Sequence, residues 1–282
     1  MVWKAANAVA LNGLFVWKFE DHWIRVERKP MPLLGLGKGF EGRTIAHISD
    51  LHLSPIVRER YLMRFVEAIN KLRVDFVAIT GDLVTGNRRA VRKVVRVIQQ
   101  FRPRIAVLAC LGNHDYGVWH PELGDKPGLA DYLSQKLLDG GVRVMNNGSH
   151  TFRRKGDILQ FVGVEDLWTR HYDPHEAFLE IDRALPVVAL VHNPDAAPQL
   201  ASLGAHWVLS GHTHGKDTRD KPFRRAMLPS EHRHFVAGEY PLGVDRFLYV
   251  NRGIGYSQRH RAHDRPEITL FTLCAAPKHQ VA

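Results

Sequence analysis

An α/β fold, with helices covering mixed β-sheets, is predicted by the alternation of two apolar patterns along the 282-residue chain. Short β-branched runs at 44–49, 74–80 and 105–111 are typical of buried strands. The segments between them, 59–72 and 88–101, carry apolar residues at helical spacing with charged residues interspersed. The first half of the chain is therefore predicted to follow a βαβαβ order.

The same alternation continues through the second half with shorter elements. We expect helices over 128–138 and around 175–184. Strands are expected over the remaining apolar runs: 142–145, 158–164, 187–191, 206–209, 247–250 and 267–273. The sequence has no fixed-period repeat and no long Gly/Ser or Pro tract, so we expect one catalytic domain over 41–282 and an N-terminal extension over 1–40.

The first 19 residues are rich in apolar side chains, but Lys4, Asn7 and Asn12 interrupt them and leave no span of membrane length. Lys18 and Glu20 follow where a secretory signal would need small residues. Two interpretations stay open: an interfacial helix that contacts a membrane, or a segment that packs on the domain itself. A cytoplasmic protein is expected, peripheral to the inner membrane in the first case.

The formal net charge of +10 favours anionic partners, namely phosphorylated small molecules, acidic lipid surfaces or nucleic acid. The densest basic run, 88–104, overlaps helical apolar spacing, so we interpret it as a solvated helix face rather than a dedicated binding patch. No motif interleaves aromatic and basic residues in the way that stacks bases. The charge itself does not choose among these partners; a phosphorylated small-molecule or lipid substrate, with peripheral contact to an anionic membrane as an option, is the expectation that the motifs below support. No specific nucleic acid and no protein partner are expected.

Polar side chains of the kind that bind metals directly follow five of the predicted strands. Taken singly, each motif is more often structural, because a Gly-Asp pair commonly makes a turn and a lone His is usually a core or surface residue. In α/β folds, however, ligands collect at the carboxyl ends of strands, and here the motifs recur in order. The candidate site residues are Asp50, His52, Asp82, Asn113, His114, His192, His212 and His214.

This set of carboxylates, imidazoles and one amide suits Mn, Fe or Zn better than Mg or Ca, and we favour Mn. Thiolates are absent from the set, which disfavours a structural zinc. Asp82 is the natural bridging residue, because one carboxylate can join two ions about 3.5 to 4 Å apart. We therefore expect two divalent metal ions.

Five ordered motifs resemble the calcineurin-like metallophosphoesterase family over most of the chain from Thr44 onward: DLH at 50–52, GDLV at 81–84, GNHD at 112–115, VHN at 191–193 and GHTH at 211–214. The resemblance implies a four-layer α/β/β/α sandwich of two mixed β-sheets flanked by helices. It further implies two sets of metal ligands joined by Asp82. The first set is Asp50, His52 and His214, and the second is Asn113, His192 and His212.

The implied reaction is hydrolysis of a phosphoester or pyrophosphate bond through in-line attack by a metal-bridging hydroxide. By the same resemblance, His114 is the acid beside the leaving group, and Asn113 combines metal ligation with orientation of a substrate oxygen. Many family phosphatases carry an Asp three residues after the bridging carboxylate to orient the imidazole, where this sequence has Thr85. Either Asp115 or a backbone group must then orient His114, or the leaving group needs little protonation.

Segments 192–195, 236–238 and 251–255 resemble a bacterial membrane-associated phosphodiesterase branch of that family. Some of its members hydrolyse lipid-linked or nucleotide-sugar substrates, including UDP-diacylglucosamine. We expect a phosphodiesterase or pyrophosphatase of this kind. The alternatives are a soluble phosphomonoesterase or cyclic-nucleotide phosphodiesterase and, ranked lower, a nuclease or a non-enzymatic metal-binding scaffold.

Overall fold

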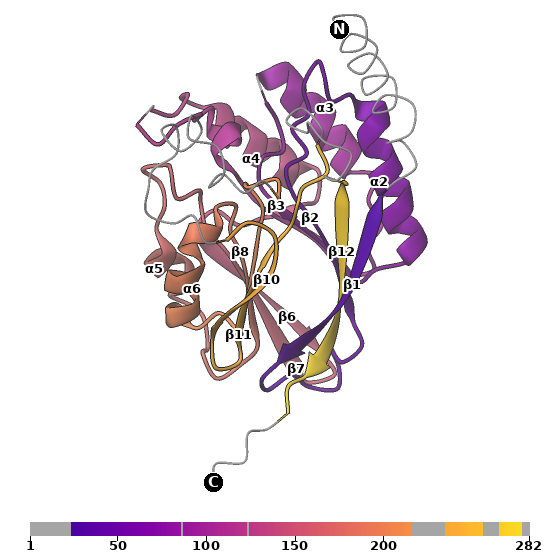
Figure 1. Cartoon of the computed structure of the whole chain (residues 1–282), viewed down its shortest axis with the longest axis vertical. Coiled ribbons are helices and arrows are strands. Elements are labelled where there is room, and N and C mark those ends of the chain that lie inside the picture. The colour runs from indigo at the N-terminus through magenta and orange to yellow at the C-terminus, as the bar shows by residue number, and fades with distance from the viewer. Residues whose placement is uncertain (1–23, 86, 123, 216–234, 256–264, 278–282) are drawn as a thin grey trace, which may run out of the picture.

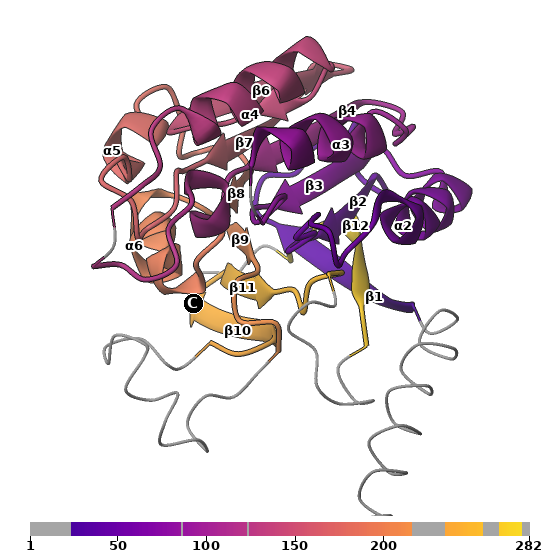
Figure 2. The same cartoon turned by 90° about the horizontal axis from the view of Figure 1, so that it is seen from above.

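Two mixed sheets face each other in the computed structural model, and helices cover the outer face of each sheet (Figures 1 and 2). The structure describes residues 24–85, 87–122, 124–215, 235–255 and 265–277. The predicted four-layer α/β/β/α sandwich is confirmed.

The first sheet has six strands, and all neighbours in it are parallel except β12 and β2, which are antiparallel. Its order is β1 (Arg25–Leu33), β12 (Glu267–Ala275), β2 (Thr44–Ile48), β3 (Phe76–Thr80), β4 (Ala106–Cys110) and β5 (Arg143–Val144). The parallel run of β2, β3 and β4 brings the carboxyl ends of three strands to one edge.

The second sheet also has six strands, with a parallel centre and an antiparallel pair at each end. Its order is β10 (Gly238–Gly243), β11 (Arg246–Val250), β9 (Trp207–Ser210), β8 (Val187–Leu190), β7 (Asp157–Gly163) and β6 (Gly148–Arg154). In this sheet β8 and β9 are adjacent and parallel, so their carboxyl ends lie at the same edge.

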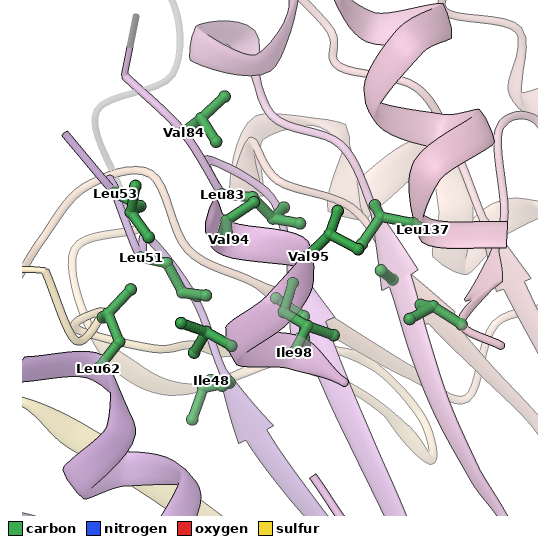
Figure 3. Packing of buried hydrophobic residues seen from close by; sticks show 14 of the residues in the cluster. Ile48, Leu51, Leu53, Leu62, Leu83, Val84, Val94, Val95, Ile98 and Leu137 are labelled. Carbon is green, nitrogen blue, oxygen red and sulfur yellow. The ribbon is translucent and has the colours of Figure 1, made fainter. Parts of the chain in front are cut away.

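Three helices cover the first sheet, namely α2 (Glu59–Leu72), α3 (Arg88–Ile98) and α4 (Leu129–Asp139). The second sheet is covered by α5 (Pro174–Ala177) and α6 (Ala197–Leu203). The described residues also form two 3-10 turns, η2 (Asn113–Tyr116) and η3 (Pro194–Ala196). Aliphatic side chains fill the layer beneath α2, α3 and α4 (Figure 3). Larger aromatic residues, including Phe76, Phe161 and Trp207, fill the layer between the sheets.

Helix α3 shows how one sequence pattern serves two environments. Asn87 caps its N-terminus by accepting hydrogen bonds from the backbone N–H groups of Arg89, at 3.0 Å, and Ala90, at 3.4 Å. Val91 and Val94 are buried against the sheet, while Arg92 is exposed. The basic run therefore forms the solvent side of an amphipathic helix, as predicted.

The helix expected around 175–184 was predicted too long, because α5 ends at Ala177. The backbone of Asp182 makes hydrogen bonds to the Gln160 side chain, donating at 3.0 Å and accepting at 2.8 Å, in place of helical ones. Leu179 is 79% exposed, so a longer helix would have had no buried apolar side there. Helix α6 and strands β1, β6 and β10 were not anticipated from the sequence.

Strand β1 lies within the predicted extension of residues 1–40, and it pairs in parallel with β12 from Arg25 to Leu33. Its Met31 and Leu33 are fully buried in the layer between the sheets. The predicted interfacial segment, 1–19, lies outside the described residues. Among those that are described, no helix has both the length and the apolar character needed to cross a membrane.

Candidate metal centre

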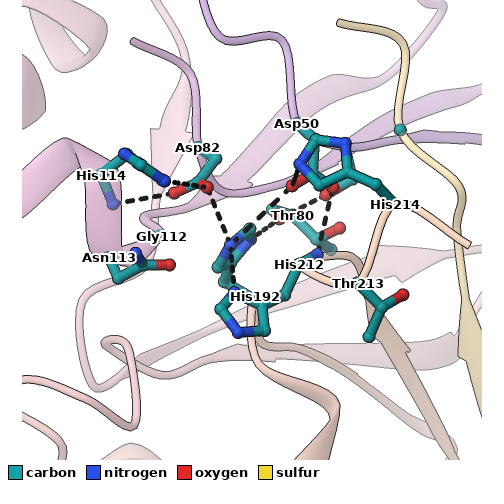
Figure 4. A network of polar contacts seen from close by, with 12 residues as sticks. Asp50, Thr80, Asp82, Gly112, Asn113, His114, His192, His212, Thr213 and His214 are labelled. Carbon is teal, nitrogen blue, oxygen red and sulfur yellow. Dashed lines mark hydrogen bonds and ion pairs between the residues drawn. The ribbon is translucent and has the colours of Figure 1, made fainter. Parts of the chain in front are cut away.

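The side chains singled out from the sequence converge where the carboxyl ends of strands from both sheets meet (Figure 4). They come from the loops after β2, β3 and β4 of the first sheet and after β8 and β9 of the second. All eight candidates belong to this group: Asp50, His52, Asp82, Asn113, His114, His192, His212 and His214. The site thus lies where the carboxyl ends of strands from the two sheets meet, and how the sheets pack could not be predicted from the sequence.

One half of the group is formed by Asp50, His52 and His214. Asp50 Oδ1 lies 3.3 Å from His214 Nε2 and 3.7 Å from His52 Nε2, and the two Nε2 atoms are 3.0 Å apart. All three side chains are buried. Three potential ligand atoms within such short distances of one another can surround one cation.

The second set of ligands that the resemblance implies is His192, His212 and Asn113, and His192 Nε2 also lies 3.9 Å from Asp50 Oδ1 of the first set. His192 Nε2 lies 3.2 Å from His212 Nδ1. Asn113 donates from its Nδ2 to the carbonyl of Val118 at 2.7 Å, which fixes the amide, and its Oδ1 is buried without a hydrogen-bond partner among the described residues. A buried carbonyl oxygen without a donor is costly unless something absent from the chain, such as a cation, binds it.

Asp82 contacts both halves. Its Oδ2 lies 3.4 Å from His52 Nε2 and 3.2 Å from His192 Nε2, and its Oδ1 accepts a hydrogen bond from the backbone N–H of His114 at 2.9 Å. A carboxylate between two sets of ligands is the geometry expected of a residue that bridges two ions. The residues present therefore fit a pair of divalent cations.

Neighbouring groups fix which nitrogen of each imidazole is presented to the centre. His192 donates from Nδ1 to the carbonyl of Thr80 at 2.8 Å, so Nε2 is the nitrogen that faces Asp82. His52 Nδ1 lies 2.8 Å from Thr85 Oγ1. With the proton on Nδ1, His52 keeps Nε2 available in the same way, and such outer partners tune ligand orientation and basicity. Thr85 therefore orients a candidate ligand, a role that the sequence analysis did not assign to it.

The backbone at the site is strained. Among the described residues, nine non-glycine residues have a positive φ, and five of them are candidate ligands: Asp50, His52, Asp82, His212 and His214. Their φ values lie between 46° and 72°, in the left-handed region, which costs of the order of 1–3 kcal/mol for a residue with a side chain. Strain of this kind persists where surrounding structure enforces it, and it clusters at functional sites.

Backbone hydrogen bonds hold the ligand loops together. The N–H of Asp50 donates to the Gly81 carbonyl at 3.1 Å, and the N–H of His52 donates to that of Asp82 at 2.8 Å. The site also needs a small residue at Gly112, since a Cβ there would lie 2.7 Å from His192 Cγ. The space at this glycine is thus taken by ligand side chains rather than by substrate.

Asp115 does not orient His114, although the sequence left that role open to it. Its carboxylate accepts three backbone N–H groups, from Leu83 at 3.2 Å, Val84 at 3.0 Å and Gly112 at 3.0 Å. Burial and the nearby charge of Asp82 raise the pKa of Asp115 to about 7. Asp115 therefore ties the loop after β3 to the loop after β4.

A later segment supports Asp50 from the other side. The N–H of Ile254 donates to the carbonyl of Ser49 at 2.9 Å, and the N–H of Gly255 donates to that of Asp50 at 2.8 Å. Gly253 has a φ of 75°, and a Cβ there would lie 2.7 Å from Asp50 Cβ. Part of the 251–255 motif thus braces a candidate ligand.

The carboxylates and imidazoles shift one another's pKa values. Burial would raise the pKa of Asp82, but the adjacent His192 and His114 hold it well below its ordinary value. Burial would likewise lower the pKa of His192, yet Asp82 and Asp50 raise it well above its ordinary value. Any cation that binds here must displace the protons that the carboxylates hold on the imidazoles.

We predict that Thr85→Val weakens metal binding by about 10- to 100-fold, because His52 loses the partner that orients it. Thr85→Ser keeps the hydroxyl and should retain most of the affinity. Calorimetric titration of the metal-free protein with Mn²⁺ gives the affinity of each variant. Equal affinities in the Val and Ser variants would count against this role.

Comparison with known proteins agrees with this geometry. A family model described as calcineurin-like phosphoesterase matches residues 43–216, a span that contains all eight candidates. The chain is 28% identical to the uncharacterized metallophosphoesterase YkuE of Bacillus subtilis, over 95% of this chain and 93% of that protein. It is 24% identical to the UDP-2,3-diacylglucosamine pyrophosphatase LpxG of Chlamydia muridarum, over 96% and 95%. It is 28% identical to the phosphodiesterase YaeI of Escherichia coli, over 81% of each protein.

Proposed function

Since this chain belongs to the calcineurin-like phosphoesterase family and is thus a metal-dependent phosphoester hydrolase, we propose that it cleaves a phosphodiester or pyrophosphate bond in a lipid-linked or nucleotide-sugar substrate. The observation that carries the chemistry is the place of Asp82, whose Oδ2 lies within 3.4 Å of imidazoles from both halves of the site. That arrangement supports a centre of two cations.

In this proposal, each half of the site holds one divalent cation, with Mn favoured. Asp50, His52 and His214 hold the first, Asn113, His192 and His212 hold the second, and Asp82 contacts both. When bound, the cations supply Lewis-acid activation of the phosphoryl group and of water.

The remaining polar groups act on the substrate. Asn113 is fixed by one N–H of its Nδ2, which donates to the Val118 carbonyl, and the second N–H of Nδ2 is the group that can donate to a phosphoryl oxygen. His114 is only partly buried and lies at the edge of the site, with its Nε2 3.8 Å from Asp82 Oδ2. From there it can give a proton to the departing oxygen.

The substrate class is supported by similarity and charge. LpxG, a pyrophosphatase of UDP-2,3-diacylglucosamine, matches nearly the whole of this chain, and YaeI is a phosphodiesterase. The net charge of +10 suits a substrate with phosphates at an anionic lipid surface. We accordingly propose a cytoplasmic protein that works at the inner membrane face.

The test compares two chromogenic esters in the presence of Mn²⁺, with the metal content of the purified protein measured alongside. We expect turnover of bis-p-nitrophenyl phosphate to exceed that of the mono-ester, and hydrolysis of UDP-2,3-diacylglucosamine to exceed that of cyclic nucleotides. A wide preference for the mono-ester would favour the soluble phosphomonoesterase instead. Absence of any turnover in fully metal-loaded protein would leave only the binding scaffold.

A further inference from the structure

Among the described residues, no hydrogen bond to Nδ1 sets the orientation of the His114 imidazole, although this nitrogen is buried. The two nearby side chains that could supply one are committed elsewhere, since Asp115 accepts three backbone N–H groups and Thr85 faces His52. The contacts that can limit the rotation of this ring are the 3.8 Å approach of Nε2 to Asp82 Oδ2 and the packing of neighbouring rings.

Two neighbouring rings pack against the His114 imidazole. The ring of Trp119 lies perpendicular to the imidazole of His114, with centroids 4.3 Å apart and an interplanar angle of 88°. On another side, the ring of His52 meets His114 at 4.9 Å and 83°. Perpendicular contacts at such distances are favourable and directional for π-systems, so rotation of His114 away from this position would lose them.

Backbone hydrogen bonds of the preceding residue fix the position of Trp119 relative to the site. Val118, its neighbour, is buried, and it forms two hydrogen bonds with Asn113: its N–H donates to the Asn113 carbonyl at 2.9 Å, and its carbonyl accepts from Asn113 Nδ2 at 2.7 Å. Trp119 itself is 55% exposed, so it contributes little to any core. Among the described residues, the ring contact of Trp119 is with His114.

We infer that Trp119 is a positioning residue, which holds the His114 imidazole by edge-to-face packing in the orientation needed to protonate the leaving oxygen. This inference rests on the proposed function, because it assigns Trp119 to the same reaction. It predicts that loss of the indole harms substrates with poor leaving groups most, since those depend most on proton donation.

The test uses bis-p-nitrophenyl phosphate and diphenyl phosphate, whose leaving phenols differ in acidity. In Trp119→Ala, we expect kcat for diphenyl phosphate to fall by about 10- to 100-fold, with a loss of about threefold or less for the nitrophenyl ester. KM and the bound metal should stay near those of the unmodified protein. Trp119→Phe keeps an aromatic ring and should restore most of the rate on diphenyl phosphate.

Two further variants separate the possible outcomes. Val244→Ala removes a side chain that is 78% exposed on the turn between β10 and β11, and it should change neither ester. In the presence of His114→Ala, the change at Trp119 should cause no further loss. Equal losses on both esters, a change confined to KM, or a full additional loss in the double variant would overturn the inference. If the unmodified, metal-loaded protein hydrolysed neither diester, the proposed function itself would fail instead.

Discussion

Asp82→Asn is expected to abolish hydrolysis and the binding of the second cation together. Asp82 Oδ2 lies 3.2 Å from His192 Nε2 and 3.4 Å from His52 Nε2, so it lies closer than Asp50 to these imidazoles from the two halves of the site. An amide has no charge to offset the repulsion between two cations and only one oxygen to offer them. We expect at most one cation per chain and a fall in kcat/KM of the order of 10³-fold or more.

The matched control is Asp75→Asn, at the opposite end of β3. Asp75 is also buried, and it accepts hydrogen bonds from the Thr44 backbone N–H at 2.9 Å and from Arg43 Nη1 at 3.1 Å. Its substitution should lower the melting temperature and leave metal content and turnover intact. Elemental analysis, thermal melts and turnover on each variant give the comparison. Near-normal turnover in Asp82→Asn would refute the bridging assignment.

The order of apolar runs and polar residues was enough to predict which side chains lie close together. Asp82 follows the apolar run that becomes β3, and His192 follows the run that becomes β8. A buried strand is a local pattern, and the residue after it must lie at the strand's end. The same pattern predicted α2 as residues 59–72, the bounds that the structure has. The candidate residues could therefore be predicted without knowing how the two sheets pack.

What the sequence did not reveal depends on contacts between distant segments. The pairing of β1 with β12 joins Arg25 to Glu267, and no local pattern encodes a partner so far along the chain. The hydrogen bond between Thr85 and His52 likewise depends on backbone hydrogen bonds that join the loops after β2 and β3. The left-handed backbone conformation of Asp50 could not be predicted from the sequence for the same reason, because the packing around this residue enforces it.

His114→Ala should have the opposite signature to Asp82→Asn: full metal content with a large loss of rate. His114 Nε2 is 3.8 Å from Asp82 Oδ2, the longest of the three imidazole contacts to that oxygen, and the ring lies at the edge of the site. A residue that gives a proton to the leaving group contributes about 10²- to 10⁴-fold. We expect a loss of that size in kcat, with metal stoichiometry unchanged.

The distances alone leave a second role open for His114, because His52, Asp82 and His114 also lie close enough to hold a cation between them. The variant separates the two roles, because removal of a ligand lowers the metal content, whereas removal of a proton donor lowers only the rate of hydrolysis. Loss of a cation with His114→Ala would place the imidazole among the ligands. His150→Ala, on the edge strand β6 and away from the centre, controls for the general effect of deleting a histidine. Metal retained together with a loss that grows as the leaving group becomes a weaker acid would identify His114 as the proton donor.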